Sequence, residues 1–179
     1  MDAFKTTDAA VKIPPKRLNA VKKDDFAVLK RLENELGINA EVNIDGNVEL
    51  EGDGGKTWIA QQVLTAIALG FDQEKALKLL NDDYYIEVID LEQFFSNEKM
   101  IERYKARVIG KEGKAKKTLE ELTDAHISIW ENKIAILGKY EELQDAKEAI
   151  QKILQGSTHS GVYGFLEKKR RHEKRTRMF

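Results

Sequence analysis

The chain has 179 residues, of which 41% are hydrophobic, so it can bury the core of one large domain or of two small ones. It contains no cysteine, which excludes disulfides, thiolate metal sites and cysteine nucleophiles. Its 30 basic and 31 acidic side chains leave a formal charge of −1, and no apolar run reaches the roughly 18 residues of a membrane span. We therefore expect a cytoplasmic protein without membrane contact.

The charged residues are unevenly distributed. Residues 103–117 and residues 168–179 each contain seven bases and one acid, whereas residues 33–55 contain seven acids and no base. A polyanion would be attracted by the C-terminal half and repelled by part of the N-terminal half.

Apolar periodicity and turn residues predict a short series of elements in the first half of the chain. They are a strand at 10–13, a helix at 26–36, strands at 40–44 and 48–51, and a helix at 58–69. Pro14-Pro15 ends the first strand, and Asp45-Gly46-Asn47 supplies a hairpin turn. Residues 71–83 would link this half to the next, with a short bridging helix at 74–80.

The second half repeats this order with one more helix. Its predicted elements are a strand at 84–90, a helix over 97–109, a helix over 114–122, strands at 126–130 and 134–137, and a helix over 143–153. The segment LENELGINAEV from Leu32 and the segment LEELTDAHISI from Leu119 take the same place in the two halves, about 87 residues apart. The chain is therefore predicted to contain an internal repeat.

Gly110-Lys111-Glu112-Gly113 joins the first two predicted helices of the second half. A helix that starts in such a loop turns free N–H groups outward, where they attract phosphate. Glycine at both ends lets a nucleic-acid backbone approach where a Cβ would obstruct it. The stretch from Arg107 to Leu119, with Ile127 and Ile129 behind it, resembles the signature of KH domains, whose loop clamps about four nucleotides of backbone. A ligand-free tight turn would need no such concentration of bases.

This resemblance implies an α+β fold of two tandem type I KH domains (βααββα), each with three helices on a small antiparallel sheet, and a basic C-terminal tail. The expected division is a degenerate KH domain lacking GxxG at 1–70, a linker at 71–83, a KH domain with intact GxxG at 84–155, and the tail at 156–179. In the first copy, Lys23-Asp24-Asp25-Phe26 takes the place of the loop. Its two carboxylates argue against phosphate binding there.

We predict an RNA-binding site formed by the second copy and the tail. Its basic side chains would contact phosphates, and its apolar side chains, together with Leu119, would form a groove for unstacked bases. The residues assigned to it are Arg107, Val108, Ile109, Gly110, Lys111, Glu112, Gly113, Lys114, Lys117, Ile127, Lys168, Lys169, Arg170 and Arg171. For the basic run of the tail, a solvated segment without a ligand is the alternative.

No pattern indicates catalysis, a cofactor or a metal site. Gly54-Gly55-Lys56-Thr57 lacks the earlier glycine of a Walker A loop, because Leu50 stands there. His126, His159 and His172 lie at no zinc-ligand spacing. The chain is therefore predicted to act by binding and not as an enzyme.

Three features together resemble one family: a first copy without GxxG, a second with GKEG, and a tail that contains VYGFLEKKRR. The segments DDYY from Asp82 and EELTDAHIS from Glu120 add to the resemblance. The chain resembles archaeal KH-domain proteins of the Dim or partner-of-NOB (Krr-type) family of small-subunit ribosomal RNA processing factors. The resemblance implies binding of single-stranded RNA near the 3′ end of small-subunit rRNA during ribosome biogenesis, with a PIN-domain nuclease or a translation initiation factor as a protein partner.

A second hypothesis makes the chain an adaptor that docks a translation or processing factor, with RNA binding secondary. The acid-only stretch at residues 33–55 motivates it. Partners that remain bound after nuclease treatment would favour the adaptor.

Overall fold

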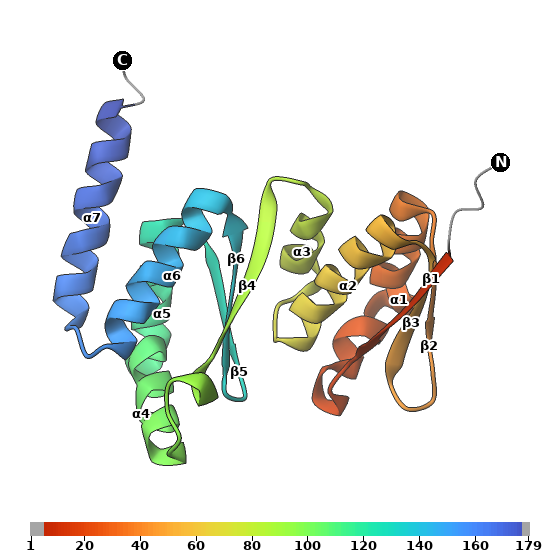
Figure 1. Cartoon of the computed structure of the whole chain (residues 1–179), viewed down its shortest axis with the longest axis horizontal. Helices are drawn as coiled ribbons and strands as arrows, with labels where there is room; N and C mark the ends of the chain where they lie inside the picture. Colours follow the sequence, from red (N-terminus) through yellow and green to blue (C-terminus); the bar gives the residue numbers. More distant parts are fainter. Residues whose placement is uncertain (1–5, 177–179) are drawn as a thin grey trace. The chain divides into compact units, whose positions relative to one another are not determined.

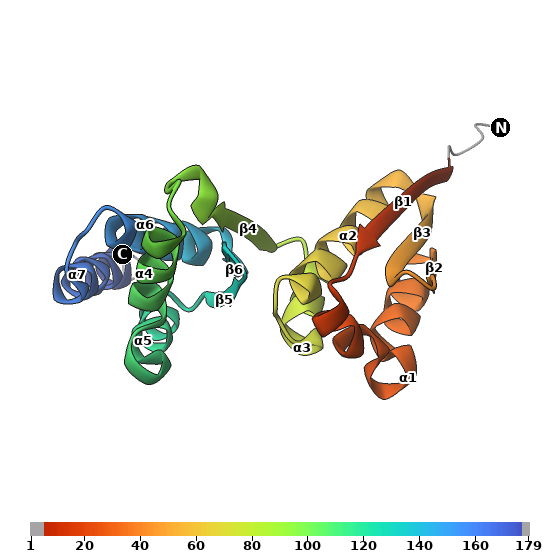
Figure 2. The same ribbon diagram turned by 90° about the horizontal axis from the view of Figure 1, so that it is seen from below.

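The computed structural model describes the backbone of residues 6–176 and the side chains of residues 9–172. The chain divides into two compact units, with the boundary along the chain between Tyr84 and Tyr85 (Figures 1 and 2). Each unit combines a three-stranded sheet with helices, so the predicted α+β class is confirmed.

The first unit is built on an antiparallel sheet in the order β1-β3-β2. Its elements are β1 (Thr6–Lys12), α1 (Pro15–Leu36), β2 (Asn39–Val42), β3 (Asn47–Asp53), α2 (Gly54–Ala68), α3 (Gln73–Ala76) and the 3₁₀ turn η1 (Leu77–Leu80). Burial alternates along β3, where Val48 and Leu50 lie in the core while Glu49 and Glu51 are exposed. The helices therefore cover one face of this sheet, as a half-buried antiparallel sheet requires.

Helix α1 is broken in its middle. Asp24, Asp25 and Phe26 have φ angles of 52°, 54° and 58°, in the left-handed region, and Lys23 is extended. The predicted start of a helix at residue 26 lies at this break. The preceding helical segment from Pro15 was not predicted, because the two prolines suggested only an interruption, although proline is favoured at the first position of a helix.

The second unit has a sheet in the order β4-β6-β5, with β5 and β6 antiparallel. Its elements are β4 (Tyr84–Asp90), the 3₁₀ turn η2 (Leu91–Gln93), α4 (Glu98–Ile109), the 3₁₀ turn η3 (Lys111–Gly113), α5 (Lys114–Thr123), β5 (His126–Trp130), β6 (Lys133–Lys139), α6 (Tyr140–Leu154) and α7 (His159–Thr176). Apolar side chains from all three strands and from α4 to α7 form one buried core. In the β5–β6 hairpin Ile127 pairs with Ile136 and both lie in the core, but burial does not alternate along β6, where residues 134–138 are all buried.

The segment expected as a basic C-terminal tail contains a regular helix, α7, which lies beside α5 and α6 (Figure 1). Val162 and Leu166 are buried in the core of the second unit. These two residues are four apart, so they lie on one side of the helix and bury it against the unit.

Candidate nucleic-acid interface

Helix α4 leads into the glycine loop. The Asn97 side chain caps its start by accepting a hydrogen bond from the Lys99 N–H, and Ile101 and Val108 bury its inner face. Its last turn closes when the Gly110 N–H donates to the Ala106 carbonyl at 2.8 Å. The first residue of the loop is therefore held at the end of a helix that packs into the core.

Gly110 holds α4 and α5 close together. Its φ of 73° and ψ of 174° lie in a region that is essentially restricted to glycine. A Cβ at this position would lie 2.5 Å from the Ala115 Cβ and 2.7 Å from the Ala115 N. Gly110 thus serves the packing of the two helices, which differs from the role in backbone access that we predicted for both glycines.

Gly113, in contrast, lies beside open space. Its φ is 75° and its ψ is 9°, a left-handed conformation, and a Cβ there would meet nothing within 4 Å. Within the part of the chain that the structure describes, no side chain caps the start of α5. Lys111, Glu112 and Lys114 are exposed around it. The Gly113 N–H donates to the Gly110 carbonyl at 3.2 Å and the Lys114 N–H donates to the Lys111 carbonyl, so an anion at this helix start would meet the N–H groups that follow in the first turn.

The lysines of the loop and of α5 differ in their availability. Lys114 and Lys117 are each 77% exposed and make only long ion pairs, at 3.9 Å to Glu112 and 3.8 Å to Glu121. Such surface pairs contribute little to stability and can be exchanged for phosphate contacts. No ion pair involves Lys111 among the residues that the structure describes.

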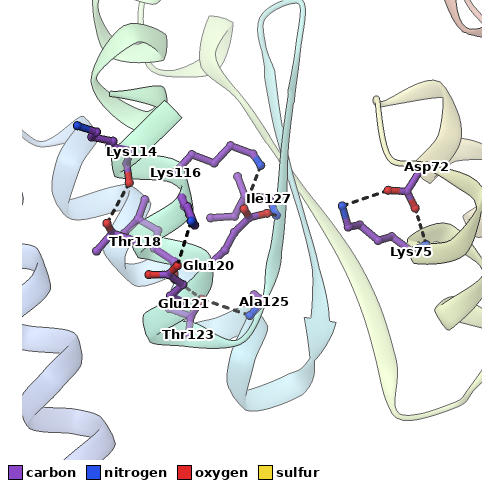
Figure 3. Close-up of polar contacts among 12 residues, drawn as sticks. Asp72, Lys75, Lys114, Lys116, Thr118, Glu120, Glu121, Thr123, Ala125 and Ile127 are labelled. Atoms are coloured by element: carbon purple, nitrogen blue, oxygen red, sulfur yellow. Dashed lines mark hydrogen bonds and ion pairs between the residues drawn. The ribbon is translucent and has the colours of Figure 1, made fainter. Parts of the chain in front are cut away.

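Lys116 is instead held in a structural network, drawn in Figure 3. Its Nζ lies 3.0 Å from Glu120 Oε2, and Glu120 Oε1 accepts a hydrogen bond of 2.7 Å from the Ile127 N–H. Glu120 therefore connects α5 to the start of β5. The sequence does not reveal this role, because an acidic residue on a polar helix face is ordinary.

The predicted apolar groove lies inside the protein. Val108 and Leu119 are fully buried, and Ile127 is 2% exposed, all three in the core of the second unit. Only Ile109 is partly accessible. Val108, Leu119 and Ile127 therefore belong to the core on which the loop packs, and they present almost no surface to a base.

Arg107 is also engaged within the protein. Its Nη1 donates to the Ile153 carbonyl at 3.0 Å, and its Nη2 donates to the Ser157 carbonyl at 2.6 Å. These contacts join α4 to the turn between α6 and α7. The sequence placed Arg107 among the phosphate contacts because its partners lie about 50 residues further along the chain and no local pattern reveals them.

The four basic residues that we predicted in α7 point in different directions. Lys169 forms ion pairs with Asp145 and Glu148 of α6. Arg170 donates to the Glu121 carbonyl at 3.0 Å, at the C-terminal end of α5. These two residues attach α7 to the rest of the unit. Lys168, Arg170 and Arg171 are exposed, and Arg171 Nε also donates to the Glu167 carbonyl of the same helix at 3.3 Å.

The corresponding loop of the first unit has the opposite charge. Asp24 and Asp25 are exposed, and Lys30 lies 2.5 Å from Asp25 Oδ2. The hydrogen bond and charge of Lys30 lower the pKa of Asp25, so this carboxylate stays ionised. Phosphate would be repelled from this loop.

Two further classes of site are not seen in the described residues. No three His, Asp or Glu side chains of that part of the chain gather where they could hold a metal ion. No helix there is long and apolar enough to cross a membrane.

An exposed glycine turn between two helices, packed on a three-stranded sheet, defines a KH-domain protein. A family model described as "Eukaryotic type KH-domain (KH-domain type I)" matches residues 85–171. A KH domain-containing protein of Methanocaldococcus jannaschii is 42% identical over 93% of this chain and 76% of its own length. The pre-rRNA-processing protein PNO1 of Coccidioides immitis is 30% identical over 92% of this chain and 68% of its own length.

The solved structures agree with this assignment. Dim2p in an a/eIF2alpha–aDim2p–rRNA complex from Pyrococcus horikoshii superposes with a TM-score of 0.84, at 28% identity, over 96% of this chain and 98% of that chain. The chain belongs to the Dim2/PNO1 family of KH-domain proteins, whose named members are pre-rRNA-processing proteins.

The same comparison corrects the predicted architecture. The KH model matches only the second unit, so the prediction of two tandem type I KH domains is wrong. The first unit is an α+β unit with its own three-stranded sheet and an acidic break in α1. The internal similarity of LENELGINAEV and LEELTDAHISI was a real signal of a shared helix-to-strand order, but it did not justify the second KH assignment.

Proposed function

We propose that this protein is a small-subunit ribosome assembly factor that binds single-stranded RNA near the 3′ end of small-subunit rRNA through its second unit. In this proposal the protein acts by binding and carries out no catalysis. The observation that carries it is the open start of α5 beside Gly113, with Lys111, Lys114 and Lys117 around it. Helix starts of this kind bind phosphate through main-chain N–H groups.

The relatives support the choice of RNA over other polyanions. PNO1 proteins are named as pre-rRNA-processing proteins, and Dim2p has been solved in a complex with rRNA. In our proposal, Lys168 and Arg171 of α7 add phosphate contacts outside the loop. Lys169 and Arg170 hold α7 in place, and Val108 and Ile127 support the loop from the core.

The test is RNA affinity measured by fluorescence anisotropy with a labelled oligoribonucleotide of the 3′-terminal small-subunit rRNA sequence. Gly113→Asp places a carboxylate at the helix start and should raise the Kd at least about tenfold, because it repels phosphate. Gly37→Asp is a matched control. Gly37 has a φ of 65° and open space at its Cβ position, but it lies in the first unit.

Two results would contradict the proposal. One is an equal loss of affinity in Gly113→Asp and Gly37→Asp, which would mean that the loss does not depend on a carboxylate in the loop. The other is binding by the wild-type chain that does not weaken with salt. The logarithm of the binding constant should fall with the logarithm of salt concentration with a slope of about −0.7 per phosphate neutralised on a single strand.

A second candidate function is an adaptor that docks a translation or processing factor. The Pyrococcus complex contains a/eIF2alpha together with aDim2p and rRNA, which favours a translation initiation factor as the partner. A PIN-domain nuclease stays a prediction of the family resemblance. Nuclease-treated pull-downs separate the two functions, because an adaptor keeps its partner when the RNA is removed.

A further inference from the structure

We propose that Arg107 is a positioning residue, which fixes the glycine loop against the turn between α6 and α7 without touching RNA. This inference rests on the proposed RNA-binding function of the loop. It assigns a different role to the arginine that stands nearest to the loop in α4.

Two N–H groups of the Arg107 guanidinium donate to carbonyl oxygens at and just after the end of α6. It donates to Ile153 at 3.0 Å and to Ser157 at 2.6 Å. The Ile153 carbonyl also accepts from the Gly156 N–H at 3.0 Å, and Ser157 lies beyond the last residue of α6, so the two bonds connect α4 to the turn that follows α6. The guanidinium carbon lies 5.6 Å from the centre of the Tyr104 ring, which covers it on another side.

The main chain of Arg107 is held from the same turn. His159 Nε2 hydrogen-bonds to the Arg107 carbonyl oxygen at 2.8 Å. A carbonyl oxygen only accepts, so Nε2 carries the proton in this contact. The first residue of α7 thus binds the end of α4, three residues before Gly110. Any shift of this connection moves the loop.

The first unit contains the same arrangement without a glycine loop. Arg17 of α1 donates from Nε to the Ile67 carbonyl at 2.9 Å and from Nη2 to the Phe71 carbonyl at 2.6 Å. Burial lowers the pKa of Arg17 from its usual value, which reflects its position inside the unit. Because this arginine is also present in the unit whose loop carries Asp24 and Asp25, we assign the arrangement to the scaffold of the units and not to RNA contact.

A positioning role and a contact role predict different salt dependence. An arginine that neutralises a phosphate adds about 0.7 to the steepness of the salt slope for single-stranded RNA. An arginine that is bonded to carbonyl oxygens adds nothing to that slope. Its loss weakens binding only because the loop is less well ordered.

The experiment uses the full chain and the same labelled RNA at several salt concentrations. Arg107→Ala should raise the Kd about tenfold and leave the salt slope unchanged. Lys114→Ala should make the slope shallower by about 0.7. Hydrogen exchange of residues 110–117 should become faster in Arg107→Ala and stay unchanged in Lys114→Ala. Arg103→Ala, at an exposed arginine of the same helix, is the control for loop exchange.

Two outcomes overturn the inference. One is a salt slope of RNA binding that becomes shallower in Arg107→Ala, as it does in Lys114→Ala. The other is an Arg107→Ala variant with unchanged RNA affinity and unchanged hydrogen exchange of the loop. If Arg107→Ala fails to fold, His159→Ala removes the contact to the Arg107 carbonyl, together with a ring contact to Tyr163, and should produce the same faster exchange at an unchanged slope. Arg107→Lys should recover part of the affinity. Failure of the proposed function looks different, because the wild-type chain would then bind no RNA while loop exchange still depended on Arg107.

Discussion

Replacing the two loop glycines separately by alanine should have very different effects on stability. At Gly110, an alanine would adopt a backbone conformation that costs about 1–3 kcal/mol. Its Cβ would also stand 2.5 Å from the Ala115 Cβ, and relief of such overpacking costs about 1–3 kcal/mol more. The sum of about 2–6 kcal/mol is a large part of the roughly 5–15 kcal/mol that stabilises a typical domain. At Gly113, only the left-handed backbone is unfavourable, at about 1–2 kcal/mol.

Intrinsic tryptophan fluorescence can report the second unit alone. The chain has two tryptophans, Trp58 in the first unit and Trp130 in the second. In a Trp58→Phe background, urea unfolding followed at Trp130 therefore measures the free energy of unfolding of the second unit. Trp58 is 60% exposed, so its replacement removes little buried surface.

The distinction between the glycines also predicts their effects on RNA. Gly113→Ala should retain most of the free energy of unfolding. Its loss of RNA affinity should come from the new Cβ, which obstructs the approach of phosphate to the start of α5. Equal free energies of unfolding for Gly110→Ala and Gly113→Ala would refute the assignment of Gly110 to helix packing. So would a Gly110→Ala variant as stable as the wild type.

Three further predictions concern α7, the α5–β5 connection and the first unit. Replacing both Lys168 and Arg171 by alanine should make the salt slope of RNA binding shallower by about 1.4 without changing the urea midpoint. Glu120→Ala leaves a β5 N–H without its carboxylate and should reduce the free energy of unfolding, measured at Trp130, by about 1–3 kcal/mol. The pKa of Asp25 is lowered, so its ion pair with Lys30 stabilises the folded chain at pH values above the ordinary carboxyl pKa. This stabilisation is lost as the pH falls through the lowered pKa. Lys30→Ala should raise the pKa of Asp25 in an NMR titration.

Local patterns were sufficient to predict most elements of the second unit. The β4 strand and the β5 strand have the predicted bounds, and α4 begins at Glu98, one residue after the predicted start of its helix. Apolar residues at helical spacing and a short turn between alternating strands determine these elements locally. The prolines misled the reading of the first unit, because proline can begin a helix as well as end a strand.

The site was predicted less completely than the fold. A loop with basic neighbours can be predicted from the local sequence, and Lys111 and Lys114 of this loop are exposed in the structure. Whether a basic side chain faces solvent depends on partners elsewhere in the chain. Arg107 binds carbonyl oxygens 46 and 50 residues away, and Arg170 binds one 49 residues away. No local motif reveals contacts over such sequence separations. The sequence alone therefore could not distinguish basic residues that are bonded within the protein from those that are available to contact RNA.

Three arginines of the chain bind main-chain carbonyl oxygens, whereas two lysines of the loop are exposed, and this difference can be tested directly. Arg17, Arg107 and Arg170 all donate to main-chain carbonyl oxygens, while Lys111 and Lys114 are exposed around the open helix start. A planar guanidinium holds two acceptors at fixed positions, whereas an ammonium acts as a mobile point charge. Lys114→Arg should therefore keep both the Kd and the salt slope. Arg107→Lys keeps the charge but loses the geometry, so loop exchange should become faster at an unchanged slope. Wild-type exchange in Arg107→Lys would mean that charge alone orders the loop.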